Sequence, residues 1–173
     1  RPLAPGEIRA FGNAALQVLP HEPGRRREVT FRCRIGVRAF HVGLAPDEAR
    51  RTATRVEMAC RDERPPDAGE AFLRDPGPGK ALALQARAYR FLLRHNGRGD
   101  RSLEREFGAS LAYRAGRNTP VEVMRFEADG RPPFVGLQFD LSSSDTKDVR
   151  GMALSLADAG ILAGTIRQRA ADI

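Results

Sequence analysis

Apolar and polar residues alternate along two neighbouring stretches in the first third of the chain. In Val29–Ile35 the apolar side chains alternate with polar ones, among them Arg32 and Arg34. This period of two predicts a strand with an apolar face and an arginine-bearing face. The alternation changes parity at Gly36 and resumes in Phe40–Leu44, as a tight hairpin with glycine in its turn requires.

The pattern then changes to helical spacing, and a similar order of elements returns in the second half. After Pro46, apolar residues recur every three to four positions and predict a helix over Asp47–Arg61. Later, alternation predicts strands at Val121–Ala128 and Val135–Leu141, joined by a hairpin turn at Asp129–Gly130.

A second helix is expected near the end of the chain. Ser142–Asp145 supplies residues that cap helix N-termini, and Gly160 is suited to end a helix. The apolar residues between them fall at helical spacing: Val149, Met152, Ala153 and Leu156.

Two stretches of the chain resemble one another. Arg9–Val18 reads RAFGNAALQV and Arg105–Arg114 reads REFGASLAYR. Matching positions are separated by about 95 residues, which predicts a tandem repeat of about 75 residues. Each copy would hold a small-residue segment, a strand, a hairpin, a strand and a helix. We therefore expect an α+β fold in which Val29–Arg61 superposes on Val121–Gly160.

A proline-rich stretch and a basic helix separate the two copies. Residues 65–100 open with a linker and continue into a predicted helix at Lys80–Asn96, which carries a basic stripe of Arg87, Arg90 and Arg94. The expected organisation is a first β-hairpin–helix repeat at 1–64, this linker and helix at 65–100, and a second repeat at 101–173.

The charge of the chain indicates an anionic partner. Its 173 residues hold 29 Lys and Arg against 22 Asp and Glu, a net charge of +7. A basic surface of this kind is typical of proteins that meet nucleic acid or another polyanion.

No pattern in the sequence indicates catalysis, a metal or a cofactor. The three histidines lack partners at ligand spacing, and no serine lies in a nucleophile-elbow pattern. We expect Cys33 and Cys60 to be buried structural thiols in a reducing compartment. No signal peptide or apolar run of membrane-spanning length is visible, so a cytoplasmic, non-enzymatic protein is expected.

The strongest local feature is a cluster of arginines. Six arginines stand against one acid in Arg25–Arg38. Such a strand face can follow a row of phosphates, and it can also be a solvated edge that resists strand pairing. We favour the first interpretation, with these candidate nucleic-acid-binding residues: Arg25, Arg26, Arg27, Arg32 and Arg34, with Arg87, Arg90 and Arg94 as a second patch.

This combination of strand–hairpin–helix units and an arginine-faced sheet resembles the Pur-alpha and Whirly class of single-strand nucleic-acid binders. The resemblance lies in element order and implies a curved antiparallel sheet, backed by helices, that presents cations and aromatic side chains to an unpaired strand. The clustered arginines predict that the protein binds nucleic acid through phosphates with little sequence preference.

Two alternatives stay open. The repeat is also suited to a non-enzymatic subunit of a secretion, phage or DNA-transfer complex, in which the arginines contact acidic protein surfaces, and a homo-oligomer fits that role. In addition, the stretch from Arg38 to Asp62 resembles the strand and first helix of a ribbon-helix-helix DNA binder, with Lys80–Asn96 as its second helix.

Overall fold

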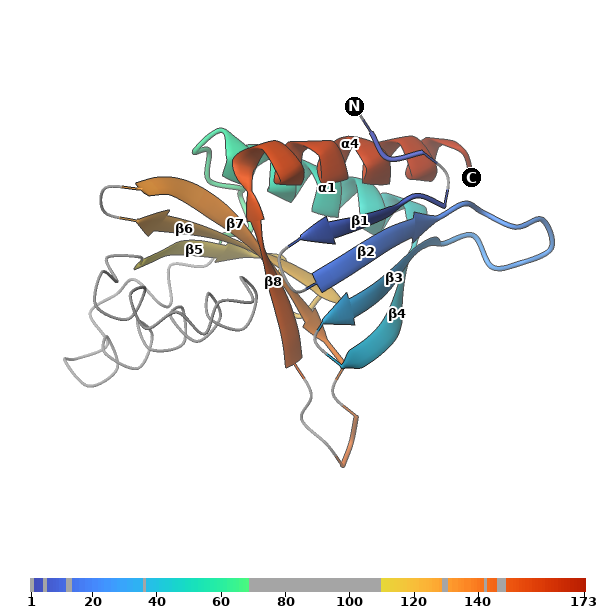
Figure 1. Ribbon diagram of the computed structural model, residues 1–173. Coiled ribbons are helices and arrows are strands. Elements are labelled where there is room, and N and C mark those ends of the chain that lie inside the picture. The colour runs from blue at the N-terminus through green and yellow to red at the C-terminus, as the bar shows by residue number, and fades with distance from the viewer. Residues whose placement is uncertain are drawn as a thin grey trace.

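The computed structural model describes residues 2–4, 6–11, 14–35, 37–68, 110–128, 131–141, 143–145 and 149–173. Within these ranges the chain forms two four-stranded antiparallel sheets, each followed by a helix (Figure 1). The elements are β1 (Ile8–Phe11), β2 (Ala14–Leu19), β3 (Val29–Ile35), β4 (Arg38–Leu44), α1 (Pro46–Cys60), β5 (Ser110–Ala115), β6 (Val121–Ala128), β7 (Arg131–Asp140), β8 (Val149–Ser155) and α4 (Leu156–Ala171).

The strongly alternating stretches form the elements that their pattern predicts. β3 pairs with β4 in antiparallel register from Val29↔Leu44 to Ile35↔Arg38, and α1 follows directly. β6 and β7 form the corresponding pair in the second sheet. The α+β class is therefore confirmed.

Each sheet is larger than the expected hairpin. The small-residue stretch near the N-terminus forms both β1 and β2, and its counterpart in the second half forms β5. β2 was missed because Ala15 and Leu19, which point away from the core, are themselves apolar and obscure the alternation.

The helix expected from Val149 onward begins later than predicted. Val149–Ser155 is strand β8, and α4 starts at Leu156 and continues through Gly160. The N-cap is Ser155, whose Oγ accepts a hydrogen bond from the backbone N–H of Asp158 at 3.1 Å. In β8 four consecutive residues are buried, so the strand has no period of two that would distinguish it from a helix.

The expected superposition of Val29–Arg61 on Val121–Gly160 is wrong in its connectivity. In the first segment a hairpin leads directly into α1, whereas β8 lies between the β6–β7 hairpin and α4. A shift of about 95 residues along the sequence thus places β3, the third strand of its sheet, on β6, the second strand of the other sheet.

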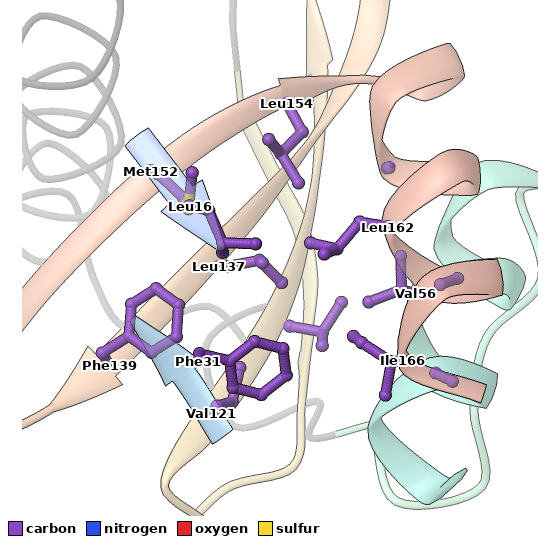
Figure 2. Packing of buried hydrophobic residues seen from close by; sticks show 14 of the residues in the cluster. Leu16, Phe31, Val56, Val121, Leu137, Phe139, Met152, Leu154, Leu162 and Ile166 are labelled. Atoms are coloured by element: carbon purple, nitrogen blue, oxygen red, sulfur yellow. The ribbon is translucent and has the colours of Figure 1, made fainter. Parts of the chain in front are cut away.

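Both sheets and both helices contribute to a single core among the described residues. Figure 2 shows Leu16 and Phe31 from the first sheet facing Val121, Leu137 and Phe139 from the second, with α1 and α4 on the other side of the cluster. Phe40 of β4 meets Phe139 of β7, with ring centroids 5.3 Å apart.

The two helices contact both halves of the chain. α1 and α4 lie side by side over the sheets (Figure 1), and α1, which follows the first sheet in sequence, packs mainly on α4 and on β6 of the second. Neither of these described helices is long and apolar enough to cross a membrane. The predicted basic helix at Lys80–Asn96 lies outside the described residues.

Candidate nucleic-acid interface

The face of the β1–β4 sheet that points away from the helices, here called the outer face, is built from aligned residues of all its strands. The strand register places its side chains in rows that cross the sheet. These rows are Ala10–Ala15–Arg34–Ala39, then Ile8–Gln17–Arg32–His41, then Leu19–Thr30–Gly43.

Arg32 and Arg34 lie on this outer face and are exposed, as the alternation predicts. They follow one another along β3, about 6.8 Å apart at their Cα atoms for a strand rise of about 3.4 Å per residue. His41 is exposed next to Arg32 on β4. The three rows themselves contain no acid.

Most other arginines of the described residues are neutralised by carboxylates. On α1, for example, Arg50 pairs with Asp47 and Arg51 with Glu48. Within the described ranges, by contrast, Arg32, Arg34 and His41 have no hydrogen-bond or ion-pair partner. The outer face therefore carries positive charge that no acid of the described residues neutralises.

Buried arginines hold the two halves together. Arg55 of α1 pairs with Glu48 and with Asp67, and Asp67 in turn accepts a hydrogen bond from Gly116 N–H at 3.2 Å. Arg125 of β6 donates to the carbonyl oxygen of Ala59 in the last turn of α1. These two arginines are thus buried and unavailable to a partner.

The three loop arginines singled out in the sequence lie between β2 and β3, beyond the end of the outer face. Arg25 pairs with Glu22 at 2.9 Å and Arg26 with Glu28 at 3.5 Å. Arg27 donates to the backbone oxygen of Ile173 at 2.9 Å, which connects this loop to the C-terminus. Each of them thus has a partner within the molecule, whereas Arg32 and Arg34 have none among the described residues.

The carboxylate of Glu28 lies at the end of the outer face nearest the β2–β3 loop. A Cβ placed on Gly43 would lie within 2.4 Å of Glu28 Oε2, so the missing side chain at Gly43 leaves room for this carboxylate. Glu28 thereby lies against the third row of the outer face, and only the two rows holding Arg34 and Arg32 remain free of acid.

The second sheet does not repeat this surface. One face of the β5–β8 sheet likewise points away from the shared core. On that face Arg114 forms a bidentate ion pair with Glu122. Met124 and Phe126 are buried there, and Phe126 stacks on Phe134 at 4.7 Å. The candidate interface is therefore confined to the first sheet.

The cysteines offer no reactive group. Cys33 is buried in the core, and burial raises the pKa of its thiol to about 12. Burial also raises the pKa of Cys60, which is half-buried with its Sγ 3.5 Å from the carbonyl oxygen of Leu156. Burial thus disfavours the thiolate at both positions, and the thiolate is the nucleophilic form of cysteine.

The remaining sequence-based candidates fall elsewhere. Arg87, Arg90 and Arg94 lie outside the described residues. The strand of the ribbon-helix-helix interpretation is β4, the last strand of a four-stranded sheet, and its proposed second helix is likewise outside the described ranges. Among the described residues, no three His, Cys, Asp or Glu side chains are grouped closely enough to hold a metal ion.

Gln17 and Ile8 also lie on the outer face, on strands β1 and β2, which the sequence pattern does not predict. The alternation of Ala14, Leu16 and Val18 in β2 is the signal that points to Gln17.

Comparison with known proteins adds no candidate, because no family model, curated protein or solved structure matches the chain.

Proposed function

We propose that this protein is a non-enzymatic nucleic-acid-binding protein that holds an unpaired strand by its phosphates on the outer face of the β1–β4 sheet. The observation that carries the proposal is the pair of exposed arginines, Arg32 and Arg34, without an acidic partner in the described residues. Guanidinium groups bind phosphate with two parallel hydrogen bonds, and successive phosphates can follow successive arginines along a strand.

The composition of the face favours phosphates over a defined sequence. Its rows contain alanines and glycine around the arginines, and His41 is their only ring side chain. Binding to phosphates is independent of sequence, whereas base readout needs several polar groups aimed at base edges. We therefore expect sequence-tolerant binding.

We also infer an internal duplication, with β3 corresponding to β7 and β4 to β8. Its support is the shared order of four antiparallel strands and a helix in each half. Among the described side chains, unpaired arginines lie on the outer face of the first sheet and not on the corresponding face of the second, so we assign the proposed function to the first copy.

The salt dependence of binding tests the proposal directly. Each phosphate neutralised on a single strand contributes about −0.7 to the slope of log K against log salt concentration, so Arg32 and Arg34 together contribute about −1.4. Titrating a labelled single-stranded oligonucleotide at several salt concentrations should give a slope at least this steep for the intact protein. In an Arg32→Gln/Arg34→Gln variant the slope should be shallower by about 1.4.

No binding at low salt, or equal slopes for the two proteins, would contradict the proposal. The first result would favour the alternative of an assembly subunit whose arginines contact an acidic protein surface.

Removing the carboxylate at the margin of the face should strengthen binding. Glu28→Gln removes a negative charge beside Gly43 and releases Arg26 from its ion pair. For a partly exposed charge we expect a gain of about 0.5–1 kcal/mol, a two- to fivefold lower Kd, measured by fluorescence anisotropy. Glu22→Gln is the matched control, since it removes the same charge from the same loop but frees only Arg25. Equal gains in the two variants would mean that net charge, rather than this surface, governs binding.

A further inference from the structure

The middle row of the outer face combines four chemically different side chains in one line. Ile8, Gln17, Arg32 and His41 are successive Cα partners across β1 to β4. With strands about 4.8 Å apart, the row spans about 14 Å. One side of β3 thus offers an apolar side chain and an amide, and the other side offers an imidazole.

The amide of Gln17 is held in a fixed orientation. Its Nε2 donates a hydrogen bond to the carbonyl oxygen of Gly6 at 2.6 Å. Because a carbonyl can only accept, this bond also settles which end of the amide is nitrogen. The second N–H and the Oε1 atom have no partner among the described residues and can bind one donor and one acceptor side by side.

Ile8 places an apolar surface at the end of the same row. Ile8 is 67% exposed, and the only other large hydrophobic residue exposed within the described ranges is Val37 at the β3–β4 turn. Ala10 and Ala15, the neighbours of Ile8 and Gln17 in the next row, have small side chains, and Ala10 is exposed.

We infer that an unpaired nucleobase lies on the β1–β2 side of the outer face, with its flat surface against Ile8 and one edge hydrogen-bonded to the amide of Gln17. This inference rests on the proposed function, because the phosphates of the same strand occupy Arg32 and Arg34 on β3. The opposite side of β3 is less suited to a base, since the Glu28 carboxylate covers Gly43 there. Base edges in single strands are free to bind side-chain amides, and their faces pack on apolar and planar groups.

A cycle of protein and ligand variants tests the inference. The ligands are a labelled single-stranded oligonucleotide and the same strand with abasic nucleotides, which keeps every phosphate and removes the bases. The intact protein should bind the abasic strand about five- to tenfold more weakly, the lower end of what stacking on an aromatic side chain contributes, because Ile8 offers apolar contact without a ring. An Ile8→Ser/Gln17→Ala variant should bind both strands alike, with the affinity of the intact protein for the abasic one.

Val37→Ser is the matched control, because it removes the other exposed large hydrophobic residue from a turn outside the row. It should retain the full difference between the two strands. Circular dichroism of each variant verifies that the sheet is intact.

The possible outcomes test the base contact and the phosphate interface separately. If the intact protein binds both strands equally and that binding still depends on Arg32 and Arg34, the base contact is refuted and the phosphate interface stands. If the difference persists in the Ile8→Ser/Gln17→Ala variant, or vanishes in Val37→Ser, the base lies elsewhere. If neither strand is bound at low salt, the proposed function itself fails.

Discussion

Reversing the charge of Arg32 and Arg34 together is expected to weaken binding to a single-stranded oligonucleotide by about 100-fold or more. A hydrogen bond to a charged group contributes about 1.5–3 kcal/mol, and each 1.4 kcal/mol changes Kd tenfold. Losing two phosphate contacts at the lower end of that range gives the stated factor. In Arg32→Glu/Arg34→Glu, two carboxylates would in addition repel the phosphates.

The fold should tolerate this change. Both side chains are exposed and have no partner within the described part of the chain, so no buried group loses a contact. Substitutions of this kind usually alter the free energy of unfolding by within about 0.5 kcal/mol. Fluorescence anisotropy measures Kd, and thermal unfolding followed by circular dichroism measures stability.

Arg50→Glu/Arg51→Glu is the matched control. It changes the net charge by the same amount at two exposed arginines of α1, each of which is paired with an acid three residues earlier. Its effect on Kd should be small, because these positions lie on a helix rather than on the outer face. Similar losses in both variants would show that overall charge, and not the outer face, attracts the ligand.

Sequence patterns predicted β3, β4 and α1, whose two faces lie in different environments. β3 and β4 have one face in the core and the other in solvent, so their alternation is strict. α1 likewise has a buried side and a charged side. In β8, by contrast, residues 151–154 are all buried, and an apolar run without a period of two can be assigned to either a strand or a helix.

The candidate site was predicted only where it depends on local geometry. The exposure of Arg32 and Arg34 follows from strand parity alone. The partners of Arg25, Arg26 and Arg27 depend on how the loop folds, and for Arg27 the partner is Ile173 at the other end of the chain. A row of residues drawn from four strands becomes visible only once β1 and β2 are known and paired.

The second large effect concerns the shared core. We expect Phe139→Ala to lower the free energy of unfolding by about 3–5 kcal/mol, the usual cost of truncating a buried Phe. Phe139 is 1% exposed and its ring meets Phe40 of the other sheet. Since α1 and α4 also bridge the halves, this loss should appear in one cooperative transition of the whole described core.

Hydrogen exchange distinguishes a shared core from two independent units. In Phe139→Ala, amides of β3 should lose protection by the same factor as amides of β7, although the substitution lies in β7 alone. Loss confined to β5–β8 would mean that each sheet is stable by itself. A double-mutant cycle with Phe40→Ala then isolates the contact between the sheets, and a coupling of about 0.5–1.5 kcal/mol is expected for an aromatic pair in this arrangement. A coupling near zero would assign the stabilisation to burial of Phe139 within its own sheet, and the two halves would then be held together by the helices and by the buried Arg55 and Arg125.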